Sequence, residues 1–239
     1  GVYSVAYLDA IRDTVGNSEV YDSYAESTGT GIGINTPVGY IYNSIGKGVS
    51  SHGIVSNGRI YNSTGISTGG YGISSQNANS CVAISSTNYG GNGNFKNSTL
   101  ISVSNYGAFR GTHLNCSIIS SSAYGINEPV SLNNCYVESS SNVALSFRDN
   151  SNIVNSTINC KWNNTGGHGT RSSVLLSNPI VANTSIKVAN ASAYCLNMFG
   201  GSTLRYANNS FQGATTPVNT TNVTQGITNT SDSQGNILI

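Results

Sequence analysis

Two acidic residues near the middle of the chain are spaced as a pair that could carry acid–base chemistry. Glu128 lies six residues before Asn134, and Asp149 lies six residues before Asn155. Because these asparagines recur as equivalent points of a repeat, we expect the two carboxylates to stack on adjacent turns, about 5 Å apart. Carboxylates that close raise the pKa of one of them, and retaining glycoside hydrolysis uses carboxyl groups about 5 to 5.5 Å apart. Glu128 and Asp149 are therefore the candidate catalytic residues.

Two arginines accompany this pair. Arg148 directly precedes Asp149, and Arg110 lies five residues before Asn115, one repeat earlier and nearly in the same column. Two interpretations remain open: a surface network in which arginine offsets the repulsion between carboxylates, or a site that steers an acidic sugar toward the acids. Arg110 and Arg148 are therefore candidate ligand-binding residues.

A column of aromatic residues, each followed by glycine, recurs through the same region. Its members are His52, Tyr71, Tyr89, Tyr106 and Tyr124. As scaffold, a stacked ladder of rings would seal a corner, and glycine would permit the bend. As a ligand site, exposed tyrosines would form a platform for sugar rings, because their apolar faces are joined to a polar hydroxyl. The four tyrosines are the second set of candidate ligand-binding residues.

Several classes of site and function are not expected. The three histidines and five cysteines lack zinc-ligand spacing, and no phosphate-binding or HExxH motif is present, so we predict neither metal nor cofactor. The net charge is +1 and only 8% of residues are charged, which argues against nucleic acid as a partner. No apolar stretch reaches the roughly 18 residues of a membrane-spanning helix.

The cysteines fit a structural role better than a chemical one. Cys116 and Cys135 occupy the same slot of consecutive repeats. We expect a column of small buried residues there, and a disulfide between adjacent turns is the alternative.

An asparagine followed by a small residue recurs from Asn43 to Asn155, with steps of 19, 17, 18, 18, 19 and 21 residues. A fixed period in this range indicates one structural unit stacked many times. Asparagine suits a sharp bend because it tolerates positive φ, and stacked asparagine side chains can bond to each other. The column is therefore interpreted as scaffold.

Three short apolar patches recur within each repeat. Aligned on the asparagine, they include Val82 and Leu100, then Ile54 and Ile73, then Ile60 and Phe95 at the end of the repeat; Ile118 and Val137 continue the first series. Three strands per turn with bends between them describe a single-stranded, right-handed parallel β-helix, an all-β solenoid of about 19 residues per turn.

The period also divides the chain into three segments. Residues 1–38 hold five of the nine acidic residues and are interpreted as an N-terminal cap or as a junction to an upstream domain. The β-helix is expected over residues 39–212. Residues 213–239, rich in threonine and asparagine, are expected to form a C-terminal tail or cap. The chain begins at Gly1 without methionine, as we expect of a processed, tagged or partial protein.

Within the N-terminal segment, four apolar residues follow helical spacing: Val5, Leu8, Ile11 and Val15. This spacing predicts a short amphipathic helix covering the open end of the solenoid. A further strand over residues 1–8 is the alternative.

Repeats of the form Asn-Ser/Cys-x-Ile/Leu/Val, with Tyr-Gly-Ile at the second strand, resemble the right-handed parallel β-helix superfamily of pectate lyases, polygalacturonases and bacteriophage tailspikes. The resemblance covers about residues 39–212. The repeats contain no cluster of three acids, so the Ca²⁺-dependent lyase activity of the pectinolytic members is not expected. The low charge and the richness in serine, asparagine, glycine and threonine look more like a viral or cell-surface attachment module. The phage members of the superfamily are typically homotrimers, so this resemblance implies a homotrimer, an extracellular location on a virion or a cell surface, and a host cell-surface glycan as partner.

Three functions follow from these observations. The first is an attachment module that binds surface polysaccharide, with Tyr71, Tyr89, Tyr106 and Tyr124 as contacts. The second is a polysaccharide depolymerase that uses Glu128 and Asp149. The third is a structural segment of a fibre or filament without a ligand.

Overall fold

A computed structural model describes residues 1–14, 18–172, 179–198, 202–203, 205–219, 223–225 and 237–238. The chain forms two compact units. Unit 1 comprises Gly1–Gly111 and Asn115–Ser117, and unit 2 comprises Thr112–Leu114 and Ile118–Ile239. Within the described ranges every regular element is a β-strand, and no helix there could cross a lipid bilayer.

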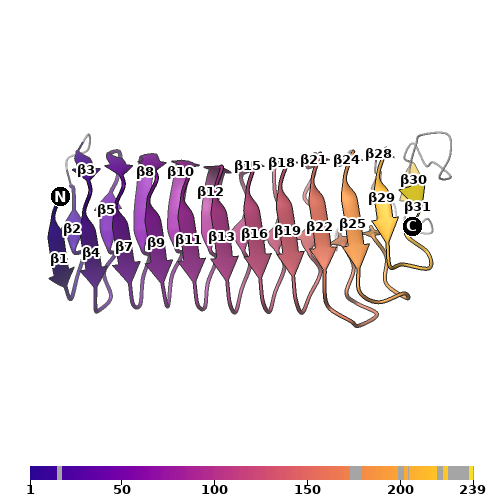
Figure 1. Cartoon of the computed structure of the whole chain (residues 1–239), viewed down its shortest axis with the longest axis horizontal. Helices are drawn as coiled ribbons and strands as arrows, with labels where there is room; N and C mark the ends of the chain where they lie inside the picture. Colours follow the sequence, from indigo (N-terminus) through magenta and orange to yellow (C-terminus); the bar gives the residue numbers. More distant parts are fainter. Residues whose placement is uncertain are drawn as a thin grey trace. The chain divides into compact units, whose positions relative to one another are not determined.

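Unit 1 is a parallel β-solenoid in which each turn, here called a rung, contributes three strand segments (Figure 1). The first strands pair in chain order and are β1 (Tyr3–Ala6), β4 (Tyr24–Ser27), β7 (Ile45–Gly48), β9 (Thr64–Ser67), β11 (Val82–Ser85) and β13 (Thr99–Ser102). Thr64 pairs with Val82, and Val82 with Thr99. These steps confirm the period expected from the sequence.

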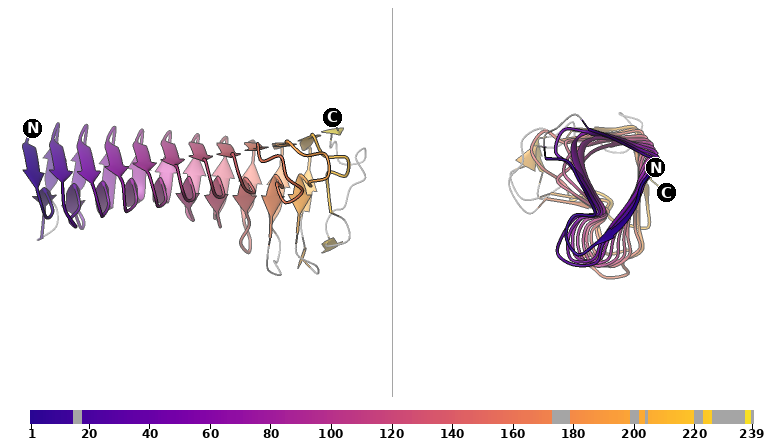
Figure 2. Two further views of the ribbon diagram at one scale, coloured as in Figure 1. Left: turned by 90° about the horizontal axis from the view of Figure 1, so that it is seen from below. Right: turned by 90° about the vertical axis from the view of Figure 1, so that its left-hand side faces the viewer.

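The second and third strand segments of unit 1 form the rest of each rung. The second segments pair as β2 (Ile11–Arg12), β5 (Ile34–Thr36), β8 (Ile54–Tyr61), β10 (Ile73–Asn79), β12 (Gly91–Lys96) and β14 (Ala108–Phe109). The third segments are β3 (Glu19–Tyr21), β6 (Tyr40–Tyr42) and the distal halves of β8, β10 and β12. The end-on view superimposes these rungs (Figure 2).

Unit 2 repeats the same plan. Its first strands are β16 (Ser117–Ser120), which begins in unit 1, β19 (Tyr136–Ser139), β22 (Thr157–Cys160), β25 (Ser185–Val188), β29 (Ser210–Gln212) and β31 (Ile237–Leu238). The second strands are β17 (Ile126–Asn127), β20 (Leu145–Ser146), β23 (Thr170–Arg171) and β26 (Leu196–Asn197).

The third strands of unit 2 are β15 (Thr112–Leu114), β18 (Ser131–Asn133), β21 (Asn152–Val154), β24 (Ile180–Ala182) and β28 (Arg205–Ala207). A separate pair joins β27 (Ser202–Thr203) to β30 (Val223–Gln225). Both units are therefore all-β parallel solenoids, as the period predicts.

Columns of aliphatic side chains fill the core of each unit. In unit 1, Ile41 and Ile60 occupy consecutive rungs of the third strands, and Ile54 and Ile73 do so on the second strands; all four are fully buried. In unit 2, Ile118 and Val137 of the first apolar series are also fully buried. Burial of a side chain of this size stabilises a fold by about 1.5–3 kcal/mol. Val82 of the same series is instead exposed and Ala83 is buried, because the corner before them lies at Ser80, one residue after the aligned Asn79.

A sharp corner joins the third strand of each rung to the first strand of the next. In unit 1 the corner residue has positive φ at Asn43 (49°), Asn62 (47°) and Asn97 (51°), a backbone region that asparagine tolerates well. Asn62 Nδ2 donates a hydrogen bond to Asn43 Oδ1 at 3.4 Å. The stacked asparagine column is thus confirmed, with one shift: Ser80 takes the left-handed backbone (56°), and Asn79 supplies the side chain.

A small buried residue follows each corner, and its side chain forms hydrogen bonds to the backbone that hold the corner in place. Ser44 Oγ donates to Tyr42 O at 2.7 Å and accepts from Ser23 N at 3.1 Å. Cysteine can take this place: Cys81 Sγ donates to Asn79 O at 3.2 Å. All five cysteines are buried free thiols, which confirms the small-residue interpretation, and burial raises the pKa of Cys81 to about 11.

The amphipathic helix predicted near the N-terminus is wrong within the described residues. Tyr3–Ala6 and Ile11–Arg12 are the strands β1 and β2, and they pair with β4 and β5; Val15 lies outside the described residues. Val5 and Leu8 are exposed, so the four apolar residues do not share one buried stripe. Pairing with the next rung satisfies the backbone and overrides the helical spacing. The alternative strand is confirmed for Tyr3–Ala6.

The alternation of inward and outward side chains gives a test of register on β13. Leu100 is fully buried, whereas the neighbouring Ile101 points outward and is half-buried. We expect Leu100→Ala to destabilise the protein by about 2–5 kcal/mol, because it leaves a cavity in the core. Thr99→Ala, at another outward position of the same strand, is the matched control and should cost less than about 1.5 kcal/mol. Thermal melting compares the two; equal losses would contradict the register.

Candidate functional site

The predicted catalytic acids occupy different local structures. Asn127 pairs with Ser146, and Ser131 pairs with Asn152, so the connection after β17 spans four residue steps and that after β20 spans six. Glu128 is half-buried at a bend (φ 54°), whereas Asp149 is exposed within the longer connection. The two extra residues interrupt the one-to-one register on which the stacking was based. An acid–base role for Glu128 and Asp149 therefore stays a prediction.

The two predicted arginines are both exposed. The guanidinium of Arg110 in unit 1 lies 4.8 Å from the centroid of the Phe109 ring, a cation–π contact. Arg148 in unit 2 precedes the turn that carries Asp149, and its backbone N–H donates to Ser151 Oγ at 3.1 Å. A role of either arginine in ligand binding stays a prediction.

The predicted aromatic column forms a continuous ladder in unit 1. His52 stacks on Tyr71, Tyr71 on Tyr89 and Tyr89 on Tyr106, with centroids 4.5, 5.1 and 5.1 Å apart and planes within 10° of parallel. These rings are half-buried, as is Tyr124 in unit 2. Because neighbouring rings cover both faces of Tyr71 and Tyr89, the solvent reaches only ring edges. The ladder therefore cannot offer ring faces along its length for stacking against sugars.

His52 is tied to the scaffold by its imidazole. Its Nδ1 accepts a hydrogen bond from Tyr71 N at 2.8 Å, and in unit 2 His168 Nδ1 accepts one from Tyr194 N at 3.0 Å. Both bonds require an unprotonated Nδ1. Burial lowers the pKa of His52, and burial together with the charge of Arg171 lowers that of His168.

These two histidines predict a dependence of stability on pH. Their pKa is lower in the folded protein than the 6.5 of the unfolded chain, so their stabilising contribution is complete above pH 6.5 and declines as the pH falls toward the folded pKa. We expect the melting temperature to drop between about pH 7.5 and about pH 5.5. In the double variant His52→Gln, His168→Gln, each glutamine keeps a hydrogen-bond acceptor but does not titrate. The melting temperature of this variant should drop less over the same pH range. An unchanged drop would assign it to other groups.

A second aromatic column, which the sequence analysis missed, lies on the outward side of the third strands in unit 1. Tyr21, Tyr42 and Tyr61 stack with centroids 4.8 and 5.2 Å apart and planes within 6° of parallel. Tyr40 lies beside Tyr42 at 6.3 Å. Each member of the stack directly precedes a corner residue, and this position before Asp22, Asn43 and Asn62 is the signal by which the sequence could have revealed it.

Polar side chains continue this surface along the axis. In the column of the tyrosine stack, Tyr61 pairs with Asn79, and Asn79 pairs with Lys96. In the parallel column, Glu19 pairs with Tyr40, Tyr40 with Arg59, and Arg59 with Asn77. We call this surface the third-strand face, and it comprises Glu19, Tyr21, Tyr40, Tyr42, Arg59, Tyr61, Asn77, Asn79 and Lys96. It gathers rings, amides and cations on one parallel sheet.

A polar cluster on the first strands of unit 2 was also missed. Lys161 Nζ lies 2.6 Å from Glu138 Oε1, Tyr136 Oη donates to Glu138 Oε2, and Asn159 Nδ2 reaches both Tyr136 Oη and Glu138 Oε2 at 3.1 and 3.3 Å. Burial alone would raise the pKa of Glu138, but the bonds from Lys161 and Tyr136 outweigh it and lower that pKa. The carboxylate is therefore ionised, and its partners are side chains of the cluster itself. This arrangement joins adjacent rungs.

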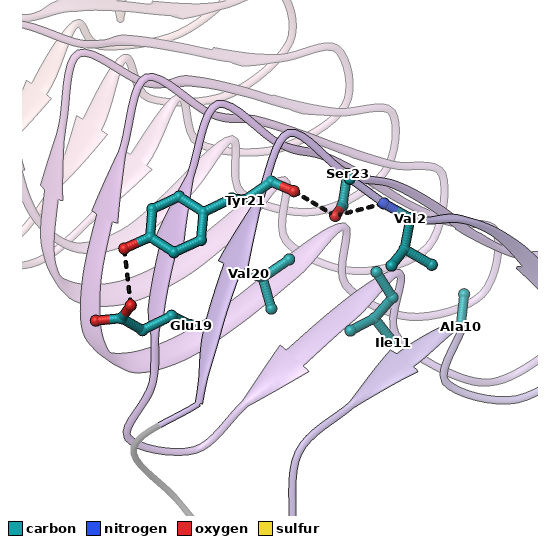
Figure 3. A pocket seen from close by; sticks show the side chains of 8 residues that line it. Val2, Ala10, Ile11, Glu19, Val20, Tyr21 and Ser23 are labelled. Carbon is teal, nitrogen blue, oxygen red and sulfur yellow. Dashed lines mark hydrogen bonds between the residues drawn. The ribbon is translucent and has the colours of Figure 1, made fainter.

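A pocket of about 520 Å³ opens at the first rung of unit 1 (Figure 3). Its lining includes Val2, Ala10, Ile11 and Val20. Ile11 is aligned with the core residue Ile34, and Val20 with Ile41. The pocket is therefore the exposed first layer of the core. Tyr21 and Glu19 also line it, and Tyr21 Oη donates to Glu19 Oε2 at 2.8 Å.

Across the described residues, no group of three or more histidine, cysteine, aspartate or glutamate side chains could hold a metal ion. Comparisons with protein-family models, curated proteins and solved structures found no significant match.

Proposed function

We propose that this protein is an extracellular attachment module, the receptor-binding part of a phage tail spike or fibre, that binds host surface polysaccharide on the third-strand face. The observation that carries the proposal is the stack of Tyr21, Tyr42 and Tyr61 in register with outward amides and cations on the following rungs. The outer ring face of Tyr61, where this stack ends, offers apolar surface to a sugar ring, while amides and hydroxyls bond the sugar's hydroxyl groups.

The periodic geometry supports a polymeric ligand. Successive rungs repeat the same backbone at strand spacing, so outward side chains form rows along the axis. A polysaccharide also repeats one unit, and several weak contacts to neighbouring units add up. The resemblance of the low-charge, serine- and asparagine-rich repeats to phage attachment modules supports the same assignment. In the ladder that begins at His52, Tyr71 and Tyr89 offer only ring edges and would contribute less.

The proposal is tested by matched tyrosine substitutions. Tyr61 and Tyr89 each stack on a neighbouring tyrosine of a ladder, so truncation perturbs a ladder in both cases, but only Tyr61 has a ring face that no other ring covers among the described residues. We expect Tyr61→Ala to weaken retention on bacterial surface polysaccharides about tenfold, a loss of about 1.4 kcal/mol. Tyr89→Ala should weaken it about twofold or less. Equal losses, or no retention of any polysaccharide by the unmodified chain, would contradict the assignment.

The same polysaccharides decide between attachment and cleavage. A depolymerase would release new reducing ends or unsaturated uronates, and Glu128→Gln would abolish that product. We expect no product from the unmodified chain, because two extra residues in the connection after β20 interrupt the alignment that would stack the two acids. If the unmodified chain releases product and Glu128→Gln abolishes that release, the protein is a depolymerase and not a purely binding module.

A homotrimer is the proposed assembly. Apolar side chains point outward on consecutive first strands of unit 1: Ile66, Ile84 and Ile101 are half-buried in mutual register, and Val82 is 36% exposed. Such a stripe of neighbouring apolar side chains favours burial against another protein surface. Trimeric assembly would also multiply weak glycan contacts.

Sedimentation velocity tests the assembly. We expect the unmodified chain to sediment as a trimer. Ile84→Lys should shift it to the monomer, because association would bury an unpaired ammonium group. Ser74→Lys, which adds the same charge on a second strand, is the control and should leave the trimer intact. A monomeric unmodified chain would contradict the proposed interface.

A further inference from the structure

The third-strand face changes character between two neighbouring rungs of unit 1. Tyr61 closes the tyrosine stack, and on the next rung its paired position is the much smaller Asn79. Tyr42 covers one face of the Tyr61 ring; on the other side no further ring stacks on Tyr61 within the described residues. Lys96 follows Asn79 one rung later. A long side chain thus stands on each side of a short one, and we call this place the Tyr61–Lys96 notch.

The floor of the notch presents an amide donor. Asn79 Oδ1 accepts from Ser80 Oγ at 3.2 Å and from Asn97 Nδ2 at 3.1 Å. These two bonds occupy the oxygen and fix the amide, so Nδ2 keeps its two N–H groups for a ligand. The neighbouring Asn77 is exposed and lies in register with Arg59. Both asparagines can therefore serve the hydroxyl groups of a sugar.

Two cations border the notch, and the structure gives them no anionic partner among the described residues. Arg59 is on the same strand as Tyr61, two residues away and on the same side, and both Arg59 and Lys96 are exposed. Other cations of unit 1 are engaged: Arg12 pairs with Asp9 at 3.6 Å, and Lys47 lies 5.1 Å from the centroid of the Tyr24 ring. In a chain with so few charges, an aromatic wall flanked by two unpaired cations favours an anionic ligand.

We propose that the Tyr61–Lys96 notch binds an anionic saccharide unit, such as a uronic acid, of the polysaccharide. The apolar face of the pyranose packs on the open face of Tyr61, its hydroxyl groups accept from the Asn79 and Asn77 amides, and its carboxylate pairs with Arg59 and Lys96. Arginine suits the carboxylate because its planar fork binds two oxygens at once. This inference rests on the proposed function and narrows its ligand to acidic polysaccharide.

Binding of matched polymers provides the test. The probes are alginate, hyaluronan, polygalacturonate and polysialic acid, each compared with its carboxyl-reduced form. We expect at least one acidic polymer to bind, and its carboxyl-reduced form to bind about tenfold more weakly. Affinity for the acidic polymer should fall as salt rises, because screening weakens exposed charge pairs.

Charge substitutions locate the effect. The double variant Arg59→Gln, Lys96→Gln should lose about tenfold in affinity for the acidic polymer and little for a neutral one. The control Lys187→Gln, Arg205→Gln removes the same charge from exposed positions on β25 and β28 and should bind as the unmodified chain does. All four side chains are exposed, so unchanged melting temperatures are expected and verify folding. Tyr61→Ala should weaken acidic and neutral polymers alike.

Each outcome decides the inference. Loss confined to the Arg59/Lys96 variant and to acidic polymers supports it. Equal losses in both double variants would assign the effect to net charge and overturn it. Binding of neutral polymers without preference for the acidic forms would overturn the anionic notch but leave the attachment function standing. Failure to bind either kind of polymer would overturn both.

Discussion

Register between rungs is the constraint on which the rest of this protein depends. A parallel strand that pairs residue by residue with the next rung places every outward side chain beside its equivalent. The corners hold that register because a left-handed residue turns the chain and a buried hydroxyl or thiol binds the carbonyl of the strand just completed. Stacked tyrosines, asparagine columns and neighbouring cations are consequences of this one constraint.

The same register explains why surfaces of different chemistry arise from one repeat. In the ladder that begins at His52, Tyr71 and Tyr89 are each enclosed by rings on both sides, so they strengthen the scaffold and expose only ring edges. Tyrosines on the third-strand face end at Tyr61, where the column passes to an asparagine and a lysine. An interruption in a column, rather than its continuity, therefore creates a place that a ligand can enter.

Much of the fold could be predicted from the sequence, because the period of the asparagines and the aliphatic columns report directly on stacking. Ile118 and Val137 are buried as expected. The N-terminal helix was predicted wrongly because apolar spacing over a few residues cannot reveal pairing with a distant rung. The column of Tyr21, Tyr42 and Tyr61 was missed because it spans only three rungs and passes to Asn79 on the next, so no aromatic period extends along the repeats. The stacking of Glu128 on Asp149 depended on an alignment that two extra residues in the connection after β20 interrupt.

A crystal structure of the chain with an acidic oligosaccharide is the most direct test, since it would show where the ligand lies on the stacked rungs. We expect a sugar ring against the open face of Tyr61, over Asn79, with its carboxylate between Arg59 and Lys96. An oligosaccharide bound on another surface, with the Tyr61–Lys96 notch empty, would contradict it.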